Sequence, residues 1–395
     1  MSDTSKKRLL LLGGSQAQTV AIRKAKELGY YTVLCDYLPD NPGQYLADEF
    51  HLVSTTDKEA VLEVARGAKI DGVVAYASDP AAPTAAYVAE TLGLPGNSYD
   101  TVRTLANKDL FRAFLKDHGF AVPRAQGFAG VEDALAQAEA FSYPVIVKPA
   151  DSSGSKGVTV VRDKSGMREA AEFAFSYSRG HRIIVESYIE KAHPYLIGGD
   201  IFVENGEIIL FGLLNCHRDE LANPLVPIGK SYPLQLDNSG KWLAKATLQR
   251  LVDEIGFNTG AMNVEMVIDS AGRCWLIDVG PRNGGNMIPD LLGMIFGVDV
   301  VEMTLRAAMG EPCRGFYATH NLHSVKDGRF SHIDYSPEIR PKLVRESVYL
   351  KPGDEVRRFN NAGDAVGIVF MRFDSESEMA RFLSDIGRHI RVVLQ

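Results

Sequence analysis

Two carboxylates interrupt apolar runs late in the chain, with a spacing that could bind a metal ion. Glu265 lies in Asn263-Val264-Glu265-Met266-Val267, and Asp278 lies in Leu276-Ile277-Asp278-Val279 after a Ser270-Ala271-Gly272 turn. Alternate residues of a strand face opposite sides, so both acids can share one face. Because unpaired buried carboxylates are costly, such a pair favours a divalent cation. Mg²⁺ suits it, since this ion prefers oxygen ligands and keeps phosphates and waters in its shell.

Arg282 follows these strands in Gly280-Pro281-Arg282-Asn283-Gly284-Gly285-Asn286. A guanidinium can donate two parallel hydrogen bonds to phosphate or acyl phosphate oxygens. The run of small and amide residues lets the backbone approach a charged ligand. The alternative is a structural salt bridge from Arg282 to one of the two carboxylates.

A lysine emerges from a second apolar strand, Tyr143-Pro144-Val145-Ile146-Val147-Lys148-Pro149-Ala150. The next residues, 151–157, are Asp-Ser-Ser-Gly-Ser-Lys-Gly, and such a small-residue loop can turn its backbone N–H groups toward a polyphosphate. A lysine that merely extends to solvent beside a polar hairpin is the alternative. Farther along, Ile183-Ile184-Val185 ends in Glu186-Ser187-Tyr188-Ile189, where a carboxylate could accept from an adenine amino group or a ribose hydroxyl.

A glycine pair near the start of the chain resembles a dinucleotide fingerprint only weakly. Gly13 and Gly14 follow the first apolar run and Asp36 comes about 20 residues later, but Ser15 and Gln18 stand where further glycines are needed. An ordinary strand-to-helix turn is the better interpretation, and a nicotinamide oxidoreductase is a distant alternative.

The elements that must position these residues change character along the chain. Residues 8–78 alternate apolar runs with amphipathic stretches, and this βαβ order predicts a parallel sheet with right-handed crossovers. A helix is expected from Asn107 to about His118. From Phe120 onward, strands joined by turns such as Asn205-Gly206 predict an α+β region. The tail from about Cys313 predicts strands and a helix over residues 375–390.

Composition excludes several classes of protein. The net charge of −7 gives no general attraction for nucleic acid or anionic lipid. The four cysteines are dispersed without metal-binding spacing. No stretch approaches about 20 apolar residues, and the first apolar run is too short for a signal peptide, so a cytoplasmic protein is expected, without nucleic-acid or membrane partners.

Taken in order, these motifs resemble the ATP-grasp ligases over almost the whole chain. The resemblance implies a Rossmann-like α/β pre-ATP-grasp domain over residues 1–102. It implies an α+β ATP-grasp fold over 103–312, with a flap subdomain over about 120–190, and a small C-terminal lobe over 313–395, similar to that of biotin carboxylase-like relatives. The implied activity is an ATP- and Mg²⁺-dependent, ADP-forming carboxylate–amine ligase that works through an acyl phosphate, with Mn²⁺ as an alternative metal.

The resemblance also assigns roles to residues. Lys108 and Lys148 would contact ATP phosphates, Arg282 would steady the acyl phosphate, and Glu265 and Asp278 would bind the metal. Many relatives have Glu at the position of Asp278 and Asn at that of Gly280, so Asn283 or Asn286 could assist the shorter acid, and Asn286 is a further candidate catalytic residue. The remaining nucleotide-binding candidates are Ser153, Gly154, Ser155 and Gly157 of the flap loop and Glu186, Ser187 and Ile189 of the strand exit.

The substrates stay open at this point. His217 and Arg218, between the nucleotide and metal strands, are candidate carboxylate binders, with a solvent-exposed loop as the alternative. The DVGPRNGGN segment is closer to ligases that join amino acids, peptides or sugar acids, which is analogy only. Other interpretations are a biotin-independent carboxylase of the aminoimidazole ribonucleotide type and a non-catalytic ATP-binding module. The oligomeric state is open, a homodimer included.

Overall fold

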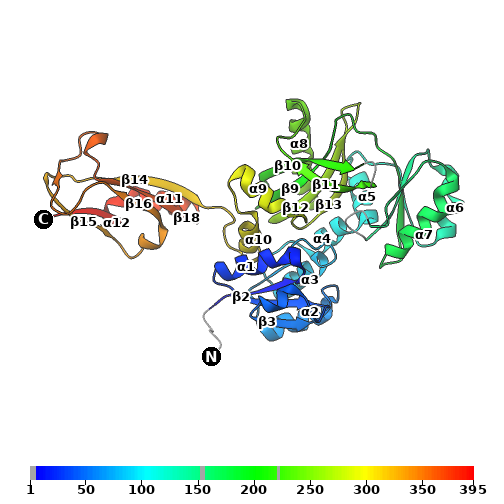
Figure 1. Cartoon of the computed structure of the whole chain (residues 1–395), viewed down its shortest axis with the longest axis horizontal. Helices are drawn as coiled ribbons and strands as arrows, with labels where there is room; N and C mark the ends of the chain where they lie inside the picture. Colours follow the sequence, from blue (N-terminus) through cyan, green and yellow to red (C-terminus); the bar gives the residue numbers. More distant parts are fainter. Residues whose placement is uncertain (1–5, 152–155, 220–222) are drawn as a thin grey trace. The chain divides into compact units, whose positions relative to one another are not determined.

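The structure, a computed structural model of the chain, describes residues 6–151, 156–219 and 223–395. The chain forms two compact units, Met1–Glu311 and Pro312–Gln395 (Figure 1). Within the described residues, none of the helices combines the length and the apolar character that a membrane crossing requires.

A four-stranded parallel sheet with the order β3-β2-β1-β4 begins the first unit and confirms the predicted βαβ region. Both faces of its apolar strands are buried, as parallel sheets require. Helices α1 and α10 pack on one face through Ile22 and Leu305, and α2 and α3 pack on the other through Val61 and Ala86. The elements are β1 Arg8–Leu12, α1 Thr19–Glu27, β2 Tyr31–Asp36, β3 Glu49–Leu52, α2 Lys58–Ala68, β4 Gly72–Val74, α3 Ala82–Leu92 and α10 Val300–Ala308.

A second four-stranded sheet, in the order β5-β8-β6-β7, is antiparallel and carries Lys148 and Glu186. Helices α6 and α7 close its core, in which Phe128, Val147 and Met167 are buried. Helix α5 precedes this sheet and agrees closely with the predicted helix from Asn107 to His118. The elements are α4 Tyr99–Ala106, α5 Lys108–Asp117, β5 Ala125–Phe128, α6 Val131–Ala136, β6 Val145–Pro149, β7 Thr159–Val161, α7 Met167–Tyr177 and β8 Ile183–Ser187.

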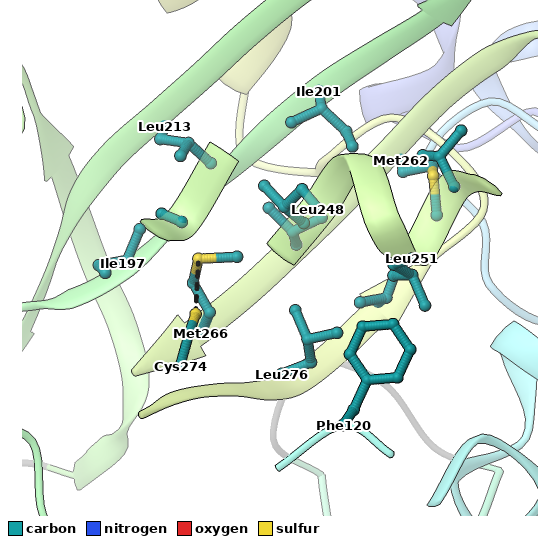
Figure 2. Packing of buried hydrophobic residues seen from close by; sticks show 14 of the residues in the cluster. Phe120, Ile197, Ile201, Leu213, Leu248, Leu251, Met262, Met266, Cys274 and Leu276 are labelled. Carbon is teal, nitrogen blue, oxygen red and sulfur yellow. Dashed lines mark hydrogen bonds between the residues drawn. The ribbon is translucent and has the colours of Figure 1, made fainter. Parts of the chain in front are cut away.

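A five-stranded antiparallel sheet in the order β11-β10-β9-β12-β13 completes the first unit, with α9 as a further helix. Figure 2 shows Leu248 and Leu251 of α8 beside Met262 and Leu276 of the sheet. Each fully buried leucine contributes about 2 kcal/mol, so this packing decides which face of β12 points inward. The elements are β9 Leu196–Glu204, β10 Glu207–Asp219, β11 Asn223–Ser231, α8 Asn238–Ile255, β12 Gly260–Ile268, β13 Cys274–Gly280 and α9 Ile288–Phe296.

The second unit contains two three-stranded antiparallel sheets, β14-β18-β16 and β17-β15-β19, around a core that includes Phe330, Val369 and Phe373. The predicted helix over residues 375–390 is wrong at its C-terminal end. The helix breaks at Asp385, and Ile390 pairs with Tyr335 in the sheet, because strand pairing overrides a local helical pattern. The elements are β14 Phe316–Leu322, β15 Gly328–Tyr335, β16 Leu343–Val348, β17 Glu355–Val356, β18 Gly367–Phe373, α11 Glu376–Ser384, α12 Ile386–His389 and β19 Ile390–Leu394.

Candidate active site

The carboxylates of Glu265 and Asp278 come from directly paired positions on β12 and β13. Val264 and Met266 point into the core beneath α8, which leaves Glu265 on the opposite face of the sheet. The two side chains are 24% and 42% exposed, so both are open to a ligand. Lys108 Nζ lies 3.1 Å from Asp278 Oδ1. The structure therefore brings together three residues that the sequence predicted from separate segments.

The electrostatics of this pair suit a divalent cation. Although the Asp278 side chain is partly exposed, its partial loss of hydration would raise its pKa, but Lys108 and Lys148 lower it, so the carboxylate is charged at neutral pH. Among the described residues, no group of three Asp, Glu, His or Cys side chains could hold a metal. Two carboxylates fit Mg²⁺ if phosphate oxygens and waters complete its shell, as is usual for this ion.

The two asparagines proposed to assist Asp278 differ in their surroundings. Asn283 is fully buried, and its Oδ1 accepts a hydrogen bond from Thr304 Oγ1 in the interior. This contact argues against its expected role at the metal. Asn286 is exposed and, like Met287 after it, has a left-handed backbone with φ of 52°. Such conformations are uncommon in residues other than glycine and cluster at functional sites. The expected catalytic role of Asn286 stays a prediction.

A buried cluster of three charges lies behind Lys108. Lys148 Nζ is 2.6 Å from Glu186 Oε2, and Arg112 Nε is 2.5 Å from Glu186 Oε1. Arg112 also donates to the carbonyls of Leu276 and Ile277 on β13, which ties α5 and the flap sheet to the strand of Asp278. The sequence interpretation missed Arg112. The sequence feature that could have identified Arg112 is its spacing of four residues from Lys108, which puts both cations on one face of the helix.

Burial lowers the pKa of Lys148 to about 8, although Glu186 opposes this shift. Burial would raise the pKa of Glu186, but Arg112 and Lys148 lower it to about 2. Glu186 is therefore charged throughout the neutral range and holds the Lys148 ammonium in one place.

This arrangement corrects the expected role of Glu186 in binding adenine or ribose. Both of its carboxylate oxygens already accept hydrogen bonds from Arg112 or Lys148, and the side chain is only 6% exposed. The backbone N–H groups of Ser187 and Tyr188 donate to the carbonyls of Arg124 and Pro144. Adenine binding at Ser187 and Ile189 stays a prediction.

Of the four expected nucleotide-binding residues of the flap loop, Gly157 is the one among the described residues. Ser153, Gly154 and Ser155 lie outside the described residues. Gly157 has a left-handed backbone with φ of 74°, and a Cβ there would lie 2.8 Å from Pro149 Cγ. Packing alone thus requires a glycine at position 157, whatever the loop binds.

His217 and Arg218, the expected carboxylate binders, have different partners in the structure, and their binding of a substrate stays a prediction. His217 Nε2 lies 2.8 Å from Ser231 Oγ, and its ring packs edge-on against Tyr195. Arg218 instead lies 3.4 Å from Glu265. The two residues are neighbours on β10, at a point where the pairing of β10 with β11 is irregular. Of the two, Arg218 is the one that contacts a residue of the metal pair.

Arg282 meets an anion that the sequence did not suggest. Its Nη2 lies 2.5 Å from Oδ2 of Asp79, which follows β4 of the N-terminal sheet, and its Nη1 donates to the Asn283 carbonyl. The structural alternative expected a salt bridge from Arg282 to Glu265 or Asp278, but the salt bridge of Arg282 in the structure is to Asp79. Beside this pair, a pocket of about 260 Å³ is lined by residues that include Asp79, Lys108, Arg179 and Asp278.

The glycine pair of the first turn is part of the scaffold. The Gln18 side chain lies against Gly13 and donates to the carbonyls of Leu12 and Tyr76. Asp36 accepts from the N–H of Gly14. The N–H of Gly14 and the side chains of Gln18 and Asp36 thus have partners within the protein, as the ordinary-turn interpretation predicts.

Comparison with known proteins supports the same grouping of residues. The family model for the ATP-binding domain of the carbamoyl-phosphate synthase L chain matches residues 107–315. The formate-dependent phosphoribosylglycinamide formyltransferase of Synechococcus sp. (strain WH7803) is 35% identical over 410 residues, which cover 96% of this chain and 95% of that protein.

Two solved structures have the same fold. The L-amino acid ligase of Bacillus licheniformis aligns over 99% of both chains, with a TM-score of 0.64 and 21% identity. The biotin carboxylase domain of Hydrogenobacter thermophilus 2-oxoglutarate carboxylase, a dimer in complex with MgADP, ADP and bicarbonate, aligns over 98% of this chain and 91% of that chain, with a TM-score of 0.64 and 19% identity. With a family model that spans more than half of its residues, the chain belongs to the ATP-grasp family of ADP-forming ligases.

Proposed function

We propose that this enzyme transfers the γ-phosphoryl group of ATP to a carboxylate and lets an amine displace phosphate from the acyl phosphate. The observation that carries the proposal is the Glu265–Asp278 pair on adjacent strands, with Lys108 3.1 Å from Asp278. Phosphoryl transfer needs charge neutralisation and in-line positioning far more than acid–base chemistry. Mg²⁺ held by Glu265 and Asp278 would neutralise phosphate charge.

The cationic side chains have separate tasks in this proposal. Lys108 lies at the metal pair and would move from Asp278 to a phosphate oxygen when nucleotide binds. Lys148 is held by Glu186, so its charge is in place before ATP arrives and little reorganisation is needed. Arg282 would donate its fork of N–H groups to the reacting oxygens. The chain needs no general base for the phosphoryl step, because a carboxylate is already a nucleophile.

The relative that is 35% identical is named for its use of formate, so formate is the first carboxylate to test. The pocket of about 260 Å³ beside Asp278 is lined by Lys108 and Asp278, so it would hold the metal and the phosphates and leaves the size of the carboxylate open. Amino acids, dipeptides and uronic acids follow as candidates, with Mn²⁺ tested in place of Mg²⁺.

Trapping of the acyl phosphate with hydroxylamine tests the proposal without knowledge of the amine. The protein is incubated with MgATP, hydroxylamine and each carboxylate, and the hydroxamate and ADP are measured. We expect equal amounts of both for one carboxylate, and neither above background for Asp278→Asn. An Asp40→Asn variant is the control, because Asp40 contacts Tyr45 on the surface of the N-terminal sheet region.

Two results would contradict the proposal. If no carboxylate stimulates ADP release, the chain binds ATP without ligase chemistry. If bicarbonate alone stimulates ADP release and a ribonucleotide amine increases it, the biotin-independent carboxylase replaces the carboxylate–amine ligase.

A further inference from the structure

Arg282 is held by a residue from a different part of the fold. Its side chain is 14% exposed, and its two terminal nitrogens donate to Asp79 Oδ2 and to the Asn283 carbonyl. Its Nε is buried without a hydrogen-bond partner among the described residues. The contact with Asp79 therefore decides where the guanidinium points, since Asp79 is the charged one of its two hydrogen-bond partners.

Gly280 makes room for this contact. A Cβ added at Gly280 would lie 2.5 Å from Asp79 Oδ1 and 3.2 Å from Arg282 Cζ. The Arg282 N–H also donates to the Gly280 carbonyl, so the chain turns tightly here. The Asp79 carboxylate thus occupies the space in which any side chain at position 280 would begin.

The loop that carries Asp79 is itself fixed. The Gln18 amide donates to the Tyr76 carbonyl at 3.0 Å, and the N–H of Ala82 donates to the Ser78 carbonyl. Ala77 has a left-handed backbone with φ of 52°, which costs free energy in a residue with a side chain. A loop that keeps a strained residue and is anchored at both sides can present a carboxylate in one position.

We infer that Asp79 is a positioning residue, which holds the Arg282 guanidinium toward the reacting phosphoryl group from the N-terminal sheet. The inference rests on the proposed function. Arg282 has five N–H donors, and Asp79 and Asn283 each engage one terminal nitrogen, so donors remain for a ligand. Without Asp79, the carboxylates that next attract the guanidinium are Asp200 and Asp278, and a turn toward either one changes the direction of its remaining N–H donors.

The test uses MgADP with aluminium fluoride, which imitates a phosphoryl group in transfer and needs no knowledge of the substrates. Calorimetry gives the MgADP affinity of the full chain with and without aluminium fluoride. We expect tighter binding with aluminium fluoride in the wild type. In Asp79→Asn this tightening should fall roughly 10-fold to 100-fold, the range for a charge-assisted hydrogen bond, while affinity for MgADP alone is unchanged.

Further variants separate positioning from a general structural role. Arg282→Lys should lose the same tightening, and the Asp79→Asn/Arg282→Lys double variant should lose no more than Arg282→Lys alone. Gly280→Ala should also lose the tightening, because its Cβ would displace both the Asp79 carboxylate and the Arg282 guanidinium. Asp40→Asn, a surface carboxylate of the same region, should behave as wild type.

The contrary results are distinct. Undiminished tightening in Asp79→Asn, or losses that multiply in the double variant, would overturn the positioning role alone. Weaker binding of MgADP itself in Asp79→Asn would make Asp79 a structural residue. No tightening in the wild type would count against phosphoryl transfer, and the inference would fall with the proposed function.

Discussion

Replacement of Lys148 by methionine tests the buried charge cluster most directly. Lys148 lies 2.6 Å from Glu186, and their side chains are 7% and 6% exposed. Methionine keeps the apolar stem and removes the ammonium, so packing changes little. The variant therefore reports on one charge, in a place where water cannot replace it.

Two magnitudes follow from these contacts. Breaking a buried ion pair costs about 3–5 kcal/mol, but Glu186 keeps Arg112 at 2.5 Å, so we expect the lower end, about 3 kcal/mol of unfolding free energy. A hydrogen bond to a charged group is worth about 1.5–3 kcal/mol. ATP affinity should therefore fall roughly 10-fold to 100-fold, since each 1.4 kcal/mol is about tenfold.

Calorimetry with a non-hydrolysable ATP analogue measures the affinity, and urea unfolding measures the stability. Lys164→Met is the matched control, because Lys164 pairs with Glu139 in the same subdomain, with side chains that are 70% and 80% exposed. Exposed pairs add little stability, so both quantities should stay near wild type. An unaltered nucleotide affinity in Lys148→Met, with the expected loss of stability, would show that this lysine is structural.

Three further predictions concern the same site. Asp278→Asn should lower turnover by orders of magnitude while the melting temperature stays near wild type, because it removes a negative charge from the metal and keeps the shape; phosphate release against Mg²⁺ concentration checks this, and normal Mg²⁺ dependence would refute the metal role. Arg282→Lys should lower turnover roughly 10-fold to 1000-fold with near-normal ATP affinity, because the fork of donors is lost; single-turnover phosphate release and thermal melts check it, and a large loss of stability with near-normal turnover would make Arg282 structural. ATP affinity should fall as the pH rises through about 8, because the pKa of Lys148 is lowered to about 8 and the ammonium that attracts phosphate loses its proton above that pH. Lys148→Arg should abolish this pH dependence. A wild-type ATP affinity that is constant from pH 7 to 9 would contradict the prediction.

Much of the site could be predicted because it depends on local periodicity. Glu265 and Asp278 each interrupt an apolar run, and strand alternation puts Glu265 on the face away from α8. Asp278 reaches that face because the pairing of β12 with β13 is irregular beside it, between the buried Leu276 and Val279. The Asn205-Gly206 turn is also local, since both residues have the positive φ that a tight hairpin requires.

The contacts that hold the site in place could not be predicted from the sequence. Arg112 meets Glu186 across 74 positions, and Arg282 meets Asp79 across 203. The chain has 50 acidic residues, and nothing in their local pattern marks Asp79 as the partner of Arg282. Which acidic residue pairs with Arg282 depends on how the N-terminal sheet packs against the strand that precedes Arg282.

The sequence by itself determined which chemistry this protein can carry: two acids for a metal, lysines and an arginine for phosphates, and the strands that bear them. These follow from residue type and from the apolar runs that the charged residues interrupt, which are properties of a few neighbouring residues. Only the tertiary structure decided that Glu186 serves Lys148 instead of adenine, and that Arg282 pairs with Asp79 instead of Asp278. Such pairings are decided by distance in the packed chain, because a buried charge takes the nearest opposite charge that packing brings within reach.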